Sequence, residues 1–349
     1  MDEKHVLKAL WAKKENEKMA GIVQINNIGW WMKQQFGTKV VKLALDGGFS
    51  CPNRDGTCGT GGCIFCSSEG SGELASAIAK SDAAAVSSAI REQIELRKEK
   101  WPGADHFIAY FQNHTNTYAP ADELREKFSE ALSQPGIMGL AIATRPDCLP
   151  DDVLDLLSEL NEKTFLWVEL GLQTIHGDNI NRGYALPVYD EAVRKLTERN
   201  IRIVTHLILG LPGETKQDME ESVRYVCRPT SSTIIEGSAS GSVENTARNQ
   251  DTRHIFGLKL HLLNVVKGAP MEKLYPGYTP FGSPEEYIGL VCDLLEIIPP
   301  DITIHRLTGD VPRKLLIAPE WSYKKRTILN GIARELRTRG SHQGCRISD

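Results

Sequence analysis

Short apolar stretches alternate with amphipathic ones along most of the chain. The apolar stretches predict β-strands at residues 39–45, 106–111, 139–143, 165–170, 203–209 and 256–263. The amphipathic stretches between them predict helices at 83–98, 121–132, 151–160, 188–199 and 214–226. Strands and helices that alternate in this way are typical of a parallel sheet, either open or curled into a partial barrel. In both architectures, functional residues gather at the carboxyl ends of the strands.

The alternation breaks once, between residues 227 and 254, where Ser, Thr, Gly and Asn dominate and no period is sustained. We interpret this segment as a flexible insertion. Beyond it, the pattern predicts a strand within KLHLLNVV, a helix at 284–298, a strand at 302–305 and a basic helix at 323–338. The predicted organisation is an N-terminal extension (1–38), a core (39–266) that contains the insertion, and a C-terminal extension (267–349).

The composition is that of an ordinary soluble globular protein, with 41% hydrophobic and 25% charged residues among 349. The net charge of −4 gives no overall attraction to nucleic acid or to an anionic membrane. The charge is unevenly distributed, however, because residues 313–346 hold nine Lys or Arg and two Glu. This basic segment is either a solvated face or a surface that contacts RNA phosphates, and the sequence leaves both interpretations open.

The cysteine pattern predicts a metal site in a reducing compartment. Four of the eight cysteines lie between residues 51 and 66, which is unlike the framework of a secreted disulfide protein. The N-terminal segment MDEKHVLKALWAKKENEKMAG lacks the apolar region of a signal peptide, and no apolar run approaches the roughly 18 residues of a membrane span. We therefore expect a cytosolic protein, in which clustered cysteines usually bind metal.

The four clustered cysteines are Cys51, Cys58, Cys63 and Cys66. Four thiolates would complete a tetrahedral zinc site, but only the last two have the close spacing of a zinc knuckle. An iron–sulfur cluster needs thiolates on a loop with enough glycine to wrap it, and four glycines lie in this stretch. The loop also follows the first predicted strand, and Phe65 beside the last cysteine favours a shielded cluster. Spacing alone leaves zinc and iron–sulfur both open.

A series of motifs along the chain resembles one protein family. They are LDGGFSCPNRDG, GGCIFC, YFQNHTNTY, ATRPDCL, VELGLQT, INRGY, HLILGLPGET, KLHLLNVVKGAPM and IHRLTGD, which run in order from Leu45 to Asp310. The chain resembles the radical S-adenosylmethionine (SAM) superfamily and, within it, the YhcC-type bacterial group, which is related to the catalytic subunit of the elongator complex. The resemblance implies an α/β fold, a partial (β/α)6 TIM-like barrel with a short C-terminal α/β extension.

The resemblance also implies that Cys51, Cys63 and Cys66 bind a [4Fe–4S] cluster and leave one iron open for SAM. An electron from an external donor would then cleave SAM reductively to a 5′-deoxyadenosyl radical, which abstracts hydrogen from an unknown substrate. Cys58 would be a bystander. Because the elongator subunit modifies tRNA, analogy adds RNA as a substrate that the basic segment would contact. The alternative is a non-catalytic, zinc- or cluster-bearing RNA-binding module that uses all four cysteines.

The same resemblance assigns SAM contacts to residues near the strand ends. They are Phe65, Gln112, Thr144, Arg145, Glu169, Gln173, Arg182, Leu209 and Gly210. Gln112 stands where relatives hold the methionine amino group, and Gln173 is expected at the ribose. Arg182 is expected at the SAM carboxylate, where a guanidinium matches two oxygens. Leu209 and Gly210 would pack against the adenine.

Four ionisable residues lie within apolar strands. Glu169 ends such a strand, and its burial would be costly without a partner. A lone histidine in an apolar strand is more often a core residue than a catalytic one, and we interpret His206 and His261 in this way. The same holds for His305, although with Arg306 it ends a strand and is a candidate to face the substrate.

Overall fold

The computed structural model describes residues 24–67, 70, 75–77, 84–98, 101, 103–177, 180–229 and 254–347. Most of the predicted insertion at 227–254 therefore lies outside the described residues, as do residues 1–23 of the predicted N-terminal extension. No helix in the described ranges is both long and apolar enough to cross a membrane.

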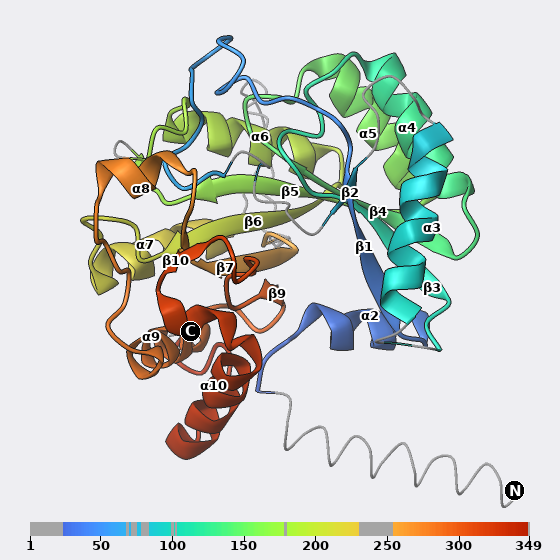
Figure 1. Cartoon of the computed structure of the whole chain (residues 1–349). Coiled ribbons are helices and arrows are strands. Elements are labelled where there is room, and N and C mark those ends of the chain that lie inside the picture. Colours follow the sequence, from blue (N-terminus) through green and yellow to red (C-terminus); the bar gives the residue numbers. More distant parts are fainter. Residues whose placement is uncertain are drawn as a thin grey trace, which may run out of the picture.

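Within the described residues, eight strands form one parallel sheet, and its central six curl into a partial barrel (Figure 1). The strands are β1 (Val40–Asp46), β2 (Ser76–Ala77), β3 (His106–Phe111), β4 (Ile137–Thr144), β5 (Phe165–Gln173), β6 (Arg202–Leu209), β7 (Gly257–Leu262) and β9 (Thr303–Arg306). Their order across the sheet is β2-β1-β3-β4-β5-β6-β7-β9, and every neighbouring pair is parallel. The predicted fold class, an α/β partial barrel of six strands with a C-terminal extension, is confirmed.

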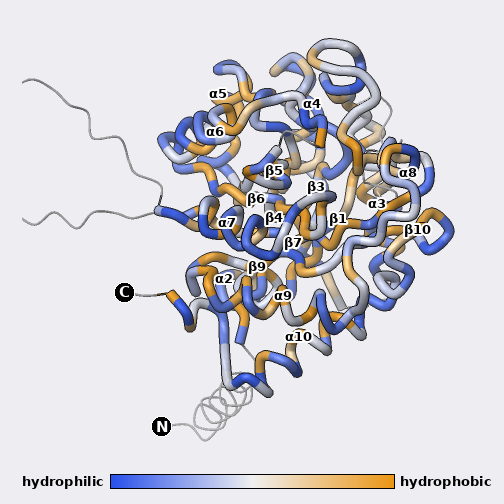
Figure 2. The backbone as a smooth tube through the Cα atoms, turned by 90° about the vertical axis from the view of Figure 1, so that its left-hand side faces the viewer, coloured by the Kyte–Doolittle hydropathy of each residue, from blue (hydrophilic) through white to orange (hydrophobic). Residues whose placement is uncertain are grey.

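Amphipathic helices cover the outer face of the barrel. They are α3 (Ala84–Lys98), α4 (Ala121–Ser133), α5 (Asp151–Lys163), α6 (Leu186–Glu198) and α7 (Lys216–Cys227). In α5, Asp151 and Asp152 occupy the first turn, where their charge suits the helix dipole, and Leu154 and Leu157 are buried in the core. The outward sides of α5 and α6 are mainly hydrophilic (Figure 2). The burial pattern therefore agrees with the periodicity of the sequence.

A helix that the sequence pattern did not predict closes the base of the barrel, at the amino ends of the strands. This is α2 (Ile28–Phe36), which begins where the side chain of Asn27 accepts a backbone hydrogen bond at 2.8 Å. Met32 is buried among the apolar side chains of the barrel interior. Trp31 stacks on Phe165, with 5.7 Å between ring centroids. The base of the barrel is therefore an aromatic and aliphatic core.

The residues from 265 onward both extend the main sheet and cover it. Strand β9 pairs with β7 and becomes an edge of the sheet. The other elements are α8 (Pro270–Leu274), α9 (Pro284–Glu296), the 3₁₀ turn η2 (Glu320–Tyr323), α10 (Lys325–Arg339) and a small antiparallel pair, β8 (Val265–Val266) with β10 (Leu316–Ala318). The predicted basic helix is α10, which buries Ile328, Ile332 and Leu336 in the main core.

Candidate functional site

A cavity lies inside the barrel at the carboxyl ends of the strands, beside the loop that follows β1. Of the residues predicted to bind the cofactors, it is lined by Cys51, Cys63, Phe65, Cys66, Gln112, Thr144, Arg145, Glu169 and Gln173. The lining does not include Arg182, Leu209 and Gly210. Residues far apart in the sequence meet here because parallel strands all end at the same edge of the sheet.

Two asparagines hold the cysteine loop in place. Asn53 is fully buried, and its amide donates to Sγ of Cys63 at 3.6 Å and to the carbonyl of Asn181. The Asn181 amide in turn donates to the carbonyl of Gly62 at 2.9 Å. These bonds tie the loop to the segment after β5. Sequence analysis missed both asparagines, whose only signal was their place in the motifs CPNRDG and INRGY.

The thiols of the cysteine loop lie at two different pockets. Cys51, Cys63 and Cys66 line the cavity, and burial raises the pKa of Cys63 to about 12, with a further contribution from the neighbouring Cys66 thiol. Cys58 is exposed and lines a separate pocket, and its Sγ accepts a hydrogen bond of 3.6 Å from Nη2 of Arg145, which lines the cavity. None of the eight cysteines forms a disulfide. Three thiols at one cavity fit an iron–sulfur cluster with an open iron better than a closed four-ligand zinc site.

Polar side chains predicted to contact SAM come from the ends of three neighbouring strands, β3, β4 and β5. Arg145 is held by Asp147 through two bonds of 2.9 and 2.6 Å. Gln173 has a left-handed backbone (φ 68°), and its amide donates to the carbonyls of Gly171 and Leu172 at 2.9 and 2.8 Å. A Cβ on Gly171 would lie 2.6 Å from this amide, so a side chain there would displace the amide of Gln173. Arg145 and Gln173 therefore have fixed positions on the cavity wall.

Arg182, which was predicted to bind the SAM carboxylate, donates hydrogen bonds to backbone carbonyls. Its Nη1 donates to Leu172 O at 2.9 Å and to Thr174 O at 2.5 Å, and its Nε donates to Tyr184 O at 3.0 Å. The residue is only 5% exposed. Its role at SAM stays a prediction, while these contacts make it a positioning residue that holds the end of β5 against the segment that follows.

We expect Arg182→Gln to lower the free energy of unfolding by about 1–3 kcal/mol, because buried carbonyls lose their donor. Urea unfolding measures this loss, and Arg194→Gln on the exposed face of α6 is the matched control, with a change of at most about 0.5 kcal/mol. If Arg182 instead binds the SAM carboxylate, the unfolding midpoint stays constant and the dissociation constant for SAM rises about tenfold or more.

The predicted adenine contacts, Leu209 and Gly210, lie at and just after the end of β6 and are not part of the cavity lining. Side chains alternate along a strand, so Ile208 lines the cavity while Leu209 is buried in the outer core. Gly210 is covered by Pro280 and Phe281, which would both lie 2.7 Å from an added Cβ. The contact of Leu209 and Gly210 with adenine stays a prediction, and the residue that β6 presents to the cavity at this level is Ile208.

A buried polar network crosses the barrel interior and forms part of the cavity wall. Glu169 is fully buried, and its Oε1 accepts from Trp167 Nε1 at 2.9 Å. Its Oε2 lies 2.8 Å from His206 Nε2 and also binds Lys259 Nζ. Lys259 donates in addition to the hydroxyl of Tyr110 at 2.9 Å. This lysine of β7 therefore bridges the interior to β3 and β5.

The charges of this network set its protonation. Burial alone would raise the pKa of Glu169, but Lys259 and His206 hold it well below its ordinary value. Burial lowers the pKa of His206 to about 4, so this imidazole is neutral at pH 7. His206 and His261 both line the cavity, contrary to their interpretation as core residues. Both histidines lie in apolar sequence because strands β6 and β7 are buried on both faces. The sequence therefore did not indicate that these two side chains line a cavity.

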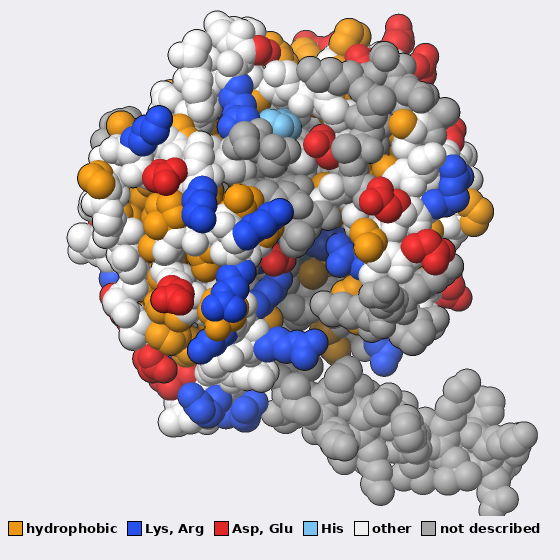
Figure 3. Space-filling view, viewed as in Figure 1, with side chains coloured by type: hydrophobic (Ala, Val, Ile, Leu, Met, Phe, Trp, Pro, Cys, Tyr) orange, Lys and Arg blue, Asp and Glu red, His pale blue; other side chains and the backbone are white. Residues whose placement is uncertain are grey.

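Basic side chains gather over β10 and α10, beside a hollow on the face shown in Figure 3. Among the described residues, the exposed Lys and Arg of this region without a carboxylate within 4.0 Å are Arg313, Lys314, Lys324, Arg326, Arg334 and Arg337. We name these six residues the basic surface. It begins directly after Asp310 and Val311, which line the cavity.

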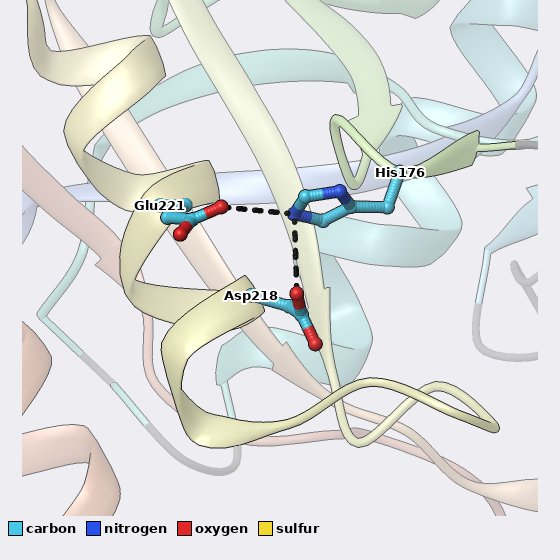
Figure 4. A group of neighbouring side chains, drawn as sticks. All are labelled: His176, Asp218 and Glu221. Atoms are coloured by element: carbon cyan, nitrogen blue, oxygen red, sulfur yellow. Dashed lines mark ion pairs between the residues drawn. The ribbon is translucent and has the colours of Figure 1, made fainter.

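A histidine and two acids meet on the outside of the barrel (Figure 4). Nε2 of His176 lies 3.7 Å from Oδ1 of Asp218 and 3.7 Å from Oε2 of Glu221. The three ligand atoms are close enough to share a cation, but His176 and Glu221 are exposed, and such groups are common on protein surfaces. We interpret the group as ion pairs that hold the first turns of α7.

Comparisons with known proteins agree with this architecture. The family model of the radical SAM superfamily matches residues 56–226, and that of the radical SAM C-terminal domain matches residues 255–338. The chain is 45% identical to protein YtqA of Bacillus subtilis over 323 residues, which cover 91% of each chain. It is 34% identical to protein YhcC of Escherichia coli K12 over 321 residues, which cover 90% of this chain and 93% of YhcC.

A solved structure shares the fold at low sequence identity. Archaeal Elp3 from Methanocaldococcus infernus matches with a TM-score of 0.56 at 15% identity, over 74% of this chain and 60% of that one. The chain therefore belongs to the radical SAM superfamily, in the group that includes YtqA and YhcC, and is distantly related to elongator complex protein 3.

Proposed function

We propose that this chain uses a [4Fe–4S] cluster on Cys51, Cys63 and Cys66, reduced by an external electron donor, to cleave SAM to a 5′-deoxyadenosyl radical that abstracts hydrogen from a substrate. One observation carries the proposal: these three thiols share a cavity with the polar strand ends, whereas Cys58 lies in another pocket. Membership of the superfamily supports it.

The chain's own residues would bind, orient and shield the reactants. Phe65 lies between the last two cluster cysteines in the loop and packs in an apolar group beside the cavity. Gln112 and Thr144 come from the ends of β3 and β4, and Arg145 and Gln173 are fixed on the same wall. The apolar base around α2 would keep water from entering opposite the cysteine loop.

The proposal is tested by reconstituting the full chain with iron and sulfide without oxygen and then adding dithionite and SAM. We expect about four iron atoms per chain and the release of 5′-deoxyadenosine, measured by chromatography. A protein that takes up about one zinc and no iron, and releases no 5′-deoxyadenosine, would contradict the proposal.

Cys58→Ser separates this enzyme from a non-catalytic module with four cysteine ligands. We expect the variant to keep its iron content and its rate of 5′-deoxyadenosine release within about twofold, because Cys58 lines a different pocket. Cys345→Ser, at the other exposed cysteine, is the matched control. Loss of metal in Cys58→Ser but not in Cys345→Ser would favour the four-ligand, RNA-binding alternative.

The basic surface supports RNA as the substrate class. The six cations of the basic surface have no carboxylate within 4.0 Å among the described residues and would neutralise phosphates, so affinity for RNA should fall steeply as salt increases. A triple variant in which Arg326, Arg334 and Arg337 are each replaced by glutamine should bind RNA with a weaker dependence on salt. The number of ionic contacts derived from that dependence should fall by about three. An unchanged dependence of RNA affinity on salt concentration would show that this surface is simply solvated.

A further inference from the structure

The cavity carries polar groups on two sides, and the proposed SAM contacts account for only one of them. That side is built from β3, β4 and β5 and holds Gln112, Thr144, Arg145 and Gln173. On the other side, His261 stands near the end of β7 and Arg306 ends β9. The strands β7 and β9 are neighbours, so these two side chains share one wall of the cavity.

Arg306 has hydrogen-bonding capacity that the protein leaves unused. Its closest carboxylate among the described residues is Asp310, whose Oδ2 lies 4.0 Å from Nη2, beyond hydrogen-bond distance. Asp310 is itself bound to Lys325 Nζ at 2.8 Å. The side chain of Arg306 is 23% exposed and lines the cavity. A planar guanidinium in this position presents several N–H donors to whatever enters.

His261 presents a second unused group to the same wall. Its Nε2 is buried from solvent and has no hydrogen-bond partner among the described residues. Burial, with a further contribution from the charge of Arg306, holds the pKa of His261 well below its ordinary value. The neutral ring has one N–H to donate at pH 7. Buried polar atoms normally have partners, so an unpaired one on a cavity wall indicates a group that a ligand satisfies.

The fixed charges around this wall sum to an excess of positive charge. Glu169 is matched by Lys259, and Asp310 is matched by Lys325. Arg306 shares Asp310 with Lys325, at the longer distance of 4.0 Å, so one positive charge remains in excess. A cavity wall with a surplus cation attracts anions.

We propose that Arg306 and His261 bind an anionic group of the substrate, either a carboxylate or a phosphate. Two oxygens of such a group match the guanidinium fork, and a third bond would come from His261. This inference rests on the proposed function, since it places the substrate opposite SAM in one cavity. It defines the reacting part of the substrate as an acid or a phosphate ester, with the anion as its anchor.

The test uses the full, reconstituted chain, with acetate or inorganic phosphate replacing chloride at constant ionic strength. An anion that binds the folded protein raises the midpoint of thermal unfolding, and the titration gives an apparent dissociation constant. We expect one of the two anions to bind, and its identity distinguishes a carboxylate from a phosphate. Arg306→Gln should raise the dissociation constant for that anion about tenfold or more. His261→Gln should raise it less, and Arg306→Lys should retain part of the affinity for the anion.

Arg194→Gln removes the same charge from the exposed face of α6 and is the matched control, with unchanged anion affinity. The inference is overturned if neither anion shifts the wild-type midpoint, or if Arg306→Gln binds both anions as well as the wild type. It is also overturned if Arg306→Gln loses SAM instead, because the pair would then serve the cofactor. Release of 5′-deoxyadenosine is measured on the same wild-type preparation, so a failure of the proposed function is seen separately.

Discussion

Replacing Cys63 with serine should remove the iron and bring 5′-deoxyadenosine release below detection. Cys63 is one of three thiols at the cavity, and Asn53 donates a hydrogen bond to its sulfur. Iron–sulfur clusters are held by thiolates, which a neutral serine hydroxyl does not replace. Since the proposed site has only three protein ligands, the loss of one leaves the cluster with two. Iron content, visible absorbance and product release measure the effect.

Cys58→Ser is the matched control for this experiment, because it makes the same chemical change in the same loop. Both variants should retain the unfolding midpoint of the metal-free protein, which shows that the fold survives. If Cys63→Ser kept its iron, or if Cys58→Ser lost it to the same extent, the three-ligand assignment would be wrong.

Lys259→Met should lower the free energy of unfolding by about 3–5 kcal/mol, which is a large part of the stability of an ordinary domain. Glu169 and Lys259 are both fully enclosed, with side-chain exposures of 0% and 1%. Removal of the lysine leaves a buried carboxylate with only His206 and Trp167 as partners. The cost is high because a charge in a poorly solvated interior has lost its counter-charge.

Denaturant unfolding of Lys259→Met, Glu169→Leu and the double variant measures the interaction between the two residues. The double variant should lose less stability than the sum of the two single variants, by at least about 1 kcal/mol, because it leaves neither charge unpaired. The exposed Lys267→Met is the control, with a change within about 0.5 kcal/mol. A Lys259→Met variant no less stable than this control would show that the ion pair adds nothing to the fold.

Hydrophobic patterning was sufficient for the barrel because its strands are short buried runs and its helices are amphipathic. The six core strands all occur, with ends shifted by at most three residues. Helix α2 was missed because a nine-residue segment carries little periodic signal, and its place under the barrel depends on tertiary contacts. The pairing of β9 with β7 could not be predicted either, because the hydrophobic pattern of a strand does not show which strand it pairs with.

Site residues with distinctive chemistry could be predicted from the sequence. Site residues that depend on which face of a strand points toward the cavity could not. The cysteine motif and the polar strand ends led to nine residues that line one cavity. Ile208, which lines the cavity, was not identified from the sequence, because an apolar strand buried on both faces does not show which residues point inward. Lys259 and Glu169 are 90 positions apart, so no local pattern relates one to the other.

The base of the barrel joins the two ends of the described chain. Asn26 N donates to Oε1 of Gln343 at 2.9 Å, a bond between residues 317 positions apart. Ile304 N donates to the carbonyl of Asn26 at 2.8 Å. During translation, this closure must wait until residue 343 has left the ribosome, although the barrel strands up to β7 are made long before. The segment that leads into α2 is therefore fixed to β9 and to residue 343 only after the rest of the barrel has been made.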